Sequence, residues 1–404
     1  MNQLIKLAWR NIWRKKRRSV ITMLSVIFAV VISVNFRSLQ WGAYDKMIEA
    51  GTKNSGYLQV QSQDYWEDKS INELIEDHVN FRNQISSVPG ISSVIPRLQN
   101  FSLAASESSS KGALVIGIDP ESENQYNELN SRVIKGSYLS ENENAVIIAE
   151  GLSNYLKLKV NDTLVLVSQG YHASIAAGQY PIKGIVKLPN PQMNRMTAYL
   201  PLTTAQAFNG AEGLVNAFML NVSDRTQVNA TQLMLQDQLG PAYAIMRWDE
   251  MHPEIQKSIN TDTTIATLLL SALYLIVGFG IIGTIVMMAL ERKREFGMLQ
   301  AIGLQKSQIQ TVILLESLML GVIGVILAWL IAFPIVNFMH NNPIPLTGEG
   351  AKSFEAMGVE PVIQFAIKPH LFALMGLIIF LIMLVASAFP LTMIRKLKMS
   401  EVIK

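Results

Sequence analysis

The sequence predicts a membrane protein with four transmembrane α-helices and a large extracytoplasmic α+β domain between the first two of them. Half of the 404 residues are hydrophobic and only 16% are charged, which argues against an ordinary soluble domain and against a disordered chain. Four long apolar stretches could each cross a bilayer of about 30 Å as a helix. We place the four spans at residues 19–40, 263–290, 309–339 and 370–394.

The distribution of charge predicts which side of the membrane each segment occupies. Lysine and arginine are concentrated in residues 1–18, 291–308 and 395–404, whereas acidic residues outnumber basic ones in residues 41–262. Basic segments stay in the cytoplasm. Both termini and segment 291–308 are therefore predicted to be cytoplasmic, and domain 41–262 and loop 340–369 to lie outside.

The N-terminal flank has a pattern of its own. In residues 1–18 apolar residues recur at helical spacing, with basic residues on another face, which predicts an amphipathic helix on the cytoplasmic surface; a plain basic flank is the alternative. The first apolar stretch is longer than that of a signal peptide and no small-x-small site follows it, so we expect a retained anchor. The chain contains no cysteine, which excludes a lipid-modified cysteine and a disulfide.

Segment 41–262 mixes strand and helix signals and is large enough to bury its own core. Residues 57–61 and 113–119 read as strands, and residues 71–85, 150–156 and 226–239 as helices. A polar loop at 169–179, rich in glycine and alanine, joins two predicted strands and contains Tyr171, His172 and Ile175.

Signals for catalysis are missing from the sequence. It has no Gly-x-x-x-x-Gly-Lys-Ser/Thr run to cradle a phosphate. The five histidines are scattered without metal-ligand spacing, and no Ser/His/Asp set can be argued. We therefore expect no catalytic residue, no metal site and no cofactor bound by this chain.

The most specific stretch begins where the second span ends, and reads Glu291-Arg-Lys-Arg-Glu-Phe-Gly-Met-Leu-Gln-Ala-Ile-Gly303. One helix through this run would place Glu291, Arg294 and Glu295 on one face. The same helix would place Met298, Leu299 and Ile302 in a separate apolar stripe. Charges beside an apolar stripe suit docking into a groove of a soluble partner; a solvated loop held by i, i+4 pairs is the alternative.

This run resembles the E-R-x-R-E-x-G-x-L-x-A-x-G signature of the MacB/LolC/LolE/FtsX permeases, the mechanotransmission class of ABC transporters. Residues 8–19 resemble the opening A-x-R-N-x-x-R-x-x-x-R-[ST] of that family, and residues 395–403 resemble its tail, with Met399 where proline is usual. Every fixed position of the central signature is present, and the resemblance assigns these positions to contact with the ATPase: Glu291, Arg292, Arg294, Glu295, Gly297, Leu299, Ala301 and Gly303.

The resemblance implies the permease subunit of an ATP-driven transporter in the inner membrane of a bacterial cell. ATP and Mg²⁺ would be bound by a separate ATPase dimer, because the first span begins close to the start of this chain. A second permease copy or a paralogue would pair with it, and a periplasmic carrier or adaptor is a further possible partner; nucleic acid is not. Lipoprotein release and MacB-like export are the implied functions, and the alternative is FtsX-like signalling to an external cell-wall hydrolase.

Two further positions carry hypotheses of their own. The loop with Tyr171, His172 and Ile175 is a candidate contact for an external partner, because the corresponding loop of LolC-like proteins engages a carrier; a plain hairpin connection is the alternative. Glu316 lies near the cytoplasmic end of the third span. We favour a structural contact between Glu316 and the basic segment 291–308 over a proton site.

The predicted topology can be tested with single cysteines, because the chain has none of its own. We expect an impermeant thiol reagent to label a cysteine introduced at Ser108 in intact spheroplasts, and to spare one at Ser307, since the bilayer would separate the reagent from the cytoplasmic side. The opposite labelling pattern would overturn the orientation.

Overall fold

The computed structural model describes residues 2–14, 16–356 and 358–395. The chain divides into a membrane unit, comprising residues 1–45, 258–345 and 362–404, and an external unit, comprising residues 46–257 and 346–361. Of the predicted tail 395–404 only Arg395 is among the described residues. Met399 therefore lies outside them.

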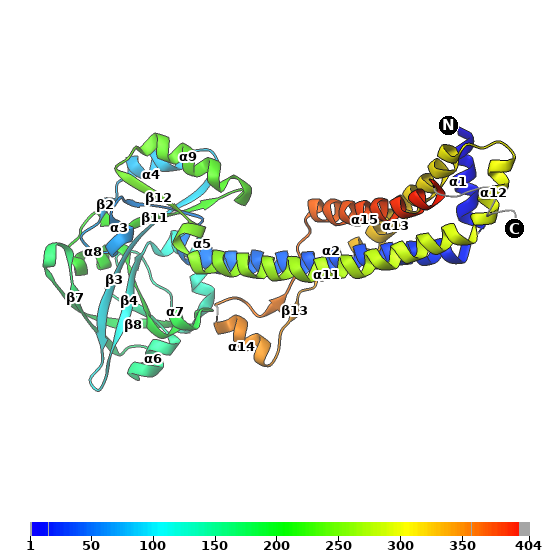
Figure 1. The fold of residues 1–404 in the computed structure, drawn as a ribbon. Helices are drawn as coiled ribbons and strands as arrows, with labels where there is room; N and C mark the ends of the chain where they lie inside the picture. Colours follow the sequence, from blue (N-terminus) through cyan, green and yellow to red (C-terminus); the bar gives the residue numbers. More distant parts are fainter. Residues whose placement is uncertain (1, 15, 357, 396–404) are drawn as a thin grey trace. The chain divides into compact units, whose positions relative to one another are not determined.

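Helices dominate the membrane unit (Figure 1). Among the described residues, four helices are long and apolar enough to cross a membrane, α2, α11, α13 and α15, which confirms the predicted fold class. The segments of this unit are α1 (Asn2–Arg14), α2 (Lys16–Ser55), α11 (Pro253–Glu291), α12 (Lys293–Ala301), α13 (Lys306–Asn341), β13 (Ile344–Pro345), β14 (Val362–Ile363) and α15 (Pro369–Arg395). Since α2 and α11 continue beyond the apolar stretches, helix ends do not mark the membrane edges, and the span boundaries stay predictions.

The N-terminal flank is helical, but the helix predicted over residues 1–18 ends at Arg14, and residues 16–18 belong to α2. α1 buries Ala8 and Ile12, whereas Trp9 and Trp13 are about half exposed and meet edge to face with ring centroids 5.9 Å apart. α1 packs on α13, so one face of the amphipathic helix is covered by protein. Exposed tryptophans suit the membrane–water interface.

Small residues allow close packing between some of the membrane helices. A Cβ atom built on Gly324 would lie 2.8 Å from Val26 of α2, and one on Gly321 would lie 3.0 Å from Met383 of α15. A larger residue at either position would require its neighbour to shift, and such close approach is common where helices meet in lipid. Gly280 and Gly283 of α11 differ, since a Cβ on either would meet no atom within 4 Å.

The external unit is built on a mixed β-sheet. Within the described part of the chain, ten strands form it in the order β12-β1-β11-β3-β4-β9-β6-β8-β5, with β7 pairing to β3 and β8. The strands of the unit are β1 (Leu58–Ser62), β2 (Ile75–Glu76), β3 (Ile91–Ala105), β4 (Ser110–Ile118), β5 (Val133–Gly136), β6 (Val146–Ala149), β7 (Thr163–Gln169), β8 (Ile175–Val186), β9 (Thr197–Pro201), β10 (Leu214–Val215), β11 (Ala217–Val222) and β12 (Tyr243–Arg247).

Short helices and turns complete the external unit. They are α3 (Tyr65–Asp68), α4 (Val79–Ser86), α5 (Pro120–Asn127), α6 (Glu150–Leu156), α7 (Pro191–Met196), α8 (Leu202–Asn209), α9 (Val228–Leu239), α10 (Trp248–Met251), α14 (Glu349–Ala356) and the 3-10 turns η1 (Leu129–Arg132), η2 (Tyr171–Ala173) and η3 (Arg225–Gln227). Successive side chains of a strand point to opposite faces. On β4, Val115 belongs to one core cluster and Ile116 to another, so the centre of the sheet is buried on both faces.

Most of the predicted elements of the external unit are confirmed, including the helix Glu150–Leu156 and the strand predicted at 57–61, which is β1 at Leu58–Ser62. The helix expected over 71–85 is wrong, because β2 occupies part of it and α4 begins only at Val79. The reason is a local cap: Nδ1 of His78 accepts a hydrogen bond of 3.0 Å from the backbone N–H of Phe81. That bond satisfies an N–H at the helix start, where intrahelical partners are missing.

A buried ion pair joins the central strands to α5. Arg97 of β3 and Glu123 of α5 are 2% and 1% exposed. The guanidinium donates to both carboxylate oxygens, with Nη2–Oε1 at 2.5 Å and Nε–Oε2 at 3.1 Å. Asn127 also donates to Oε1 at 2.5 Å. Bidentate geometry of this kind is the strongest form of charge-assisted hydrogen bond.

We expect Glu123→Gln to destabilise the external domain by about 3–5 kcal/mol, because it leaves the Arg97 guanidinium buried without its counter-charge. Thermal and denaturant unfolding of the purified full-length protein would measure the loss. The double variant Arg97→Met/Glu123→Leu removes both charges and should recover most of it. Equal stability of the single variant and the wild type would contradict this role for the pair.

Candidate functional site

The signature run 291–303 folds as two helices that meet at Arg292. α11 ends at Glu291, and α12 begins at Lys293; Arg292 between them has φ −95° and ψ 7°. Glu291 therefore belongs to a different helix from Arg294 and Glu295, and the common face predicted for these three residues is wrong. The break allows the side chain of Arg292 to turn into the protein.

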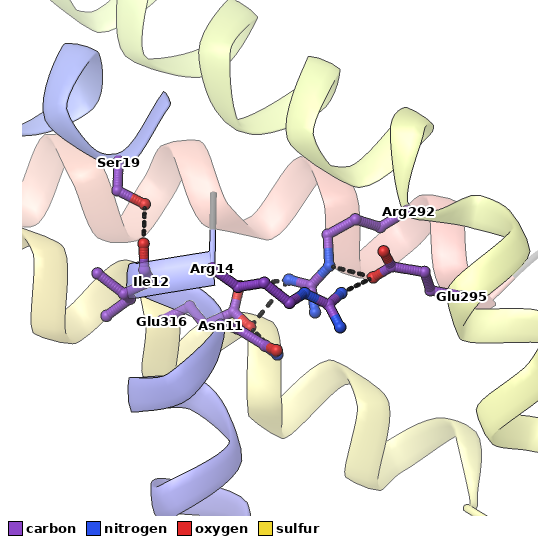
Figure 2. Close-up of polar contacts among 7 residues, drawn as sticks. All are labelled: Asn11, Ile12, Arg14, Ser19, Arg292, Glu295 and Glu316. Atoms are coloured by element: carbon purple, nitrogen blue, oxygen red, sulfur yellow. Dashed lines mark hydrogen bonds and ion pairs between the residues drawn. The ribbon is translucent and has the colours of Figure 1, made fainter. Parts of the chain in front are cut away.

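Arg292 is the centre of a buried charge network (Figure 2). Its Nη1 atom lies 2.6 Å from Oε2 and 2.9 Å from Oε1 of Glu316 on α13, and its Nε atom donates to Glu295 at 3.2 Å. Asn11 of α1 donates to Glu316 at 2.6 Å. The side chains of Arg292 and Glu316 are only 8% and 14% exposed. The predicted structural contact of Glu316 with segment 291–308 is confirmed.

Basic residues of the N-terminal flank extend the network. Arg14 of α1 lies 2.5 Å from Glu295, and Arg18 of α2 pairs with Glu291 at the end of α11. Ser19 donates to the backbone oxygen of Ile12 at 2.9 Å, which ties α2 to α1 (Figure 2). Five helices are thus joined by polar contacts among the described residues at this end of the membrane unit.

The apolar residues of α12 divide between two surroundings. Phe296 is buried against Ile309 and Ile313 of α13, and Leu299 packs on the same cluster. Met298 and Ile302 are 59% and 79% exposed. The prediction that Met298, Leu299 and Ile302 form one apolar stripe is therefore wrong, because Leu299 packs against the protein interior.

What α12 leaves exposed forms a single face. Arg294, Met298, Ala301 and Ile302 are all exposed and follow one another at i, i+4, i+7 and i+8, which is one side of a helix. Gly303 ends the segment with φ +107°, a backbone conformation that favours glycine. Gly297 is half-buried. We call Arg294, Met298, Ala301 and Ile302 the outer face of α12.

Sequence reasoning did not assign the N-terminal residues to this site. Asn11, Arg14, Arg18 and Ser19 are positions of the opening pattern that resembles the family, and the structure brings all four to the network around segment 291–303. Two resemblances far apart in the sequence thus describe one site. Their joint presence was the signal that could have found it.

The predicted partner loop is shorter than expected. β7 continues to Gln169 and β8 begins at Ile175, so only residues 170–174 connect the two strands. Tyr171 and His172 lie in η2, where the backbone N–H of His172 donates to Asn72 at 2.9 Å. Ile175 is the first residue of β8 and is 88% exposed. Partner contact through these residues stays a prediction.

Comparisons with known proteins cover both units. Residues 19–238 match the MacB-like periplasmic core domain, and residues 267–399 match the C-terminal part of FtsX-like permeases. An uncharacterized ABC transporter permease of Methanocaldococcus jannaschii is 20% identical over 84% of this chain and 86% of its own length. The lipoprotein-releasing system transmembrane protein LolC of Xylella fastidiosa is 20% identical over 58% of each chain.

Two MacB proteins are also similar. A probable export ATP-binding/permease protein MacB of Pseudomonas entomophila is 21% identical over 83% of this chain, but the match spans only 52% of that protein. The crystal structure of the periplasmic region of MacB from Actinobacillus actinomycetemcomitans has a TM-score of 0.35 and 15% identity, covering 51% of this chain and 95% of that one.

Four apolar helices and a large domain between the first two define a multi-pass membrane permease with an extracytoplasmic domain. The chain belongs to the family of ABC transporter permeases that carry a MacB-like periplasmic core domain and an FtsX-like C-terminal part, the family of MacB, LolC and FtsX. It is a non-catalytic membrane subunit, and a permease of this kind works with an ATPase.

The network predicts a specific defect for Glu316→Gln. This substitution keeps the shape of the side chain but removes the charge opposite the buried Arg292, so α12 should lose its anchor on α13. We expect amide hydrogen exchange over Lys293–Ala301 to accelerate at least about tenfold, which corresponds to a loss of about 1.4 kcal/mol in local stability. Glu212→Gln, at an exposed position of the external unit, is the control. Unchanged protection of α12 would show that the pair does not hold it.

Proposed function

We propose that this chain transmits motion from a separate ATPase dimer to its extracytoplasmic domain, and that two copies, or this chain and a paralogue, form the membrane part of the transporter. ATP and Mg²⁺ would be bound by the ATPase. The observation that carries the proposal is the two-sidedness of α12. One side is anchored by the buried Arg292–Glu316 pair, and the other presents the outer face of α12 to the surroundings.

The outer face has the composition of a docking surface. Met298 and Ile302 offer exposed apolar area, and methionine adapts its shape to a partner. Arg294 adds a positive charge that can fix the orientation of the partner. The small residues Ala301 and Gly303 leave room for a partner to approach the end of the segment closely. An amphipathic helix binds a groove in this way: its apolar side chains supply the contact area, and its charged side chains fix the register.

Movement of α12 would be passed on through the network. Arg292 and Glu295 link α12 to α13 and α1, and Arg18 links the end of α11 to α2. α2 and α11 each continue from the membrane unit into the external unit as uninterrupted helices. A displacement at the cytoplasmic ends of these two helices can therefore reach the external domain without passing through a loop.

The similarity to LolC and MacB supports two kinds of work for such a motion. The relative from Xylella is a lipoprotein-releasing protein and the relative from Pseudomonas is a probable export protein. Release of lipoproteins from the membrane or MacB-like export, in the inner membrane of a bacterial cell and with a periplasmic carrier or adaptor, is the finer form of the proposal. Tyr171, His172 and Ile175 are the candidate contact with that carrier.

The coupling role can be tested with Arg294→Glu and Ala301→Leu. The first places a like charge beside Glu295 and reverses the charge offered to the ATPase, and the second adds bulk to the outer face. We expect a stably inserted protein whose ATPase binding or stimulated ATP hydrolysis falls at least about tenfold, because like-charge contacts in an interface cost several kcal/mol. Co-purified ATPase and its turnover are the measurements.

Matched controls separate docking from folding. Arg294→Lys keeps the charge and Ala301→Ser keeps the size, so both should retain most of the binding and stimulation. If Arg294→Glu and Ala301→Leu both bind and stimulate the ATPase normally, the assignment of α12 to coupling is wrong.

A further inference from the structure

A second feature of the membrane unit lies outside the coupling network. Between the first turns of α2 and the cytoplasmic end of α11 there is an open groove with a volume of about 780 Å³. At the cytoplasmic end of the helices the groove is lined by Lys16, Arg17 and Arg18, which we call its upper part. Further along the helices it is lined by Ile21, Phe279 and Met287, which we call its lower part. The groove is therefore cationic at the end of the helices and apolar toward their middle.

Two cations of the groove have no counter-charge among the described residues. Lys16 and Arg17 are exposed, and no ion pair joins either of them to another described residue. Arg18 pairs with Glu291 through one end of its guanidinium. Among the described residues its other nitrogen, Nη1, is buried and has no hydrogen-bond partner. Because Nη1 has no accessible surface, it cannot meet a molecule in the groove, and the two cations open to an anion from outside the chain are Lys16 and Arg17.

The position of the cations sharpens this argument. They occupy the first turn of α2, which contains no acidic residue. The N-terminus of a helix carries a partial positive charge and favours anions. Of the three adjacent cations there, Arg18 has the carboxylate of Glu291 beside it, whereas Lys16 and Arg17 oppose the helix dipole with no ion pair to another described residue.

The lower half of the groove is open and apolar. Ile21, Phe279 and Met287 are 47%, 71% and 59% exposed. Gly280 and Gly283 lie between them along α11, and a Cβ atom on either would meet open space. A free anion would use only the upper half, whereas a molecule with a charged head and hydrocarbon chains would fill both.

We infer that this groove binds an anionic phospholipid of the cytoplasmic leaflet. The lipid phosphate accepts hydrogen bonds from Lys16 and Arg17. The acyl chains lie against Ile21 and Phe279, over Gly280 and Gly283. Arginine and lysine at the cytoplasmic membrane surface attract anionic lipids, and basic pockets between transmembrane helices bind phosphate headgroups. The site is separate from the outer face of α12, and the inference does not depend on ATPase coupling.

Lipid titrations of the purified full-length protein, read by native mass spectrometry, test the headgroup contact. The probes are phosphatidylglycerol and phosphatidylcholine with the same acyl chains. We expect the wild type to prefer phosphatidylglycerol, and Lys16→Gln/Arg17→Gln to bind it roughly 25-fold more weakly, at about fivefold for each cation lost. The control Lys6→Gln/Arg10→Gln removes equal charge from exposed positions of α1 outside the groove, and should change binding less than about twofold.

The apolar half is tested with all charges in place. Gly283→Leu fills the groove and should weaken phosphatidylglycerol binding by a similar factor, whereas Ser271→Leu, at an exposed position elsewhere on α11, should not. If Gly283→Leu fails to fold, the pair of charge variants decides alone. Neither inorganic phosphate nor glycerophosphoglycerol, the headgroup without chains, should displace the bound lipid.

Three results would overturn the inference. Equal losses in the Lys16/Arg17 and Lys6/Arg10 variants would reduce the effect to general attraction of a basic flank. Displacement of the lipid by inorganic phosphate or glycerophosphoglycerol would make the groove an anion site. A change in the number of protein copies in Gly283→Leu, with lipid binding intact, would show that a second copy covers this face.

Discussion

The arrangement of the cytoplasmic end of this permease depends on one buried charge. A guanidinium cannot be left in a protein interior without a counter-charge, and Arg292 is 7% exposed. Glu316, within hydrogen-bond distance, and Glu295 supply that counter-charge. Arg292 stands at the break between α11, which ends at Glu291, and α12, which begins at Lys293. Asn11 joins α1 to the same carboxylate.

This dependence explains which parts of the site could be predicted from the sequence. The signature and the exposed positions Arg294 and Ala301 follow from local pattern and from resemblance. The break at Arg292 does not, because the periodicity of residues 291–302 fits one continuous helix. At this break Arg292 contacts Glu316, 24 positions further along the chain. A pattern read over a few helical turns has no access to a partner at that separation.

The external domain shows the same limit in a different form. The composition of strands such as β1 and β6 is typical of β-structure, so their existence could be predicted from the sequence. Their order was not, since β4 pairs in parallel with β9 and β6 in parallel with β8, and neither pairing leaves a local mark in the sequence. The helix predicted over 71–85 is wrong because the prediction used only the spacing of apolar residues and did not consider a helix cap at His78. Ile75 and Glu76 pair with β10 instead, and His78 caps the start of α4 by accepting a hydrogen bond from Phe81.

The N-terminal flank shows how residues with the same charge come to have different roles. The positive-inside rule counts Arg14, Lys16, Arg17 and Arg18 equally, as cations that keep this end in the cytoplasm. In the folded chain Arg14 and Arg18 pair with Glu295 and Glu291 and bind the first two helices to the signature segment. Lys16 and Arg17 face outward from the same turn of α2. Glu291 and Glu295 therefore form ion pairs within the protein, in addition to belonging to the signature segment. Arg14 and Arg18 are the cations that they pair with inside the protein. Lys16 and Arg17 stay exposed and are the cations that can contact the membrane.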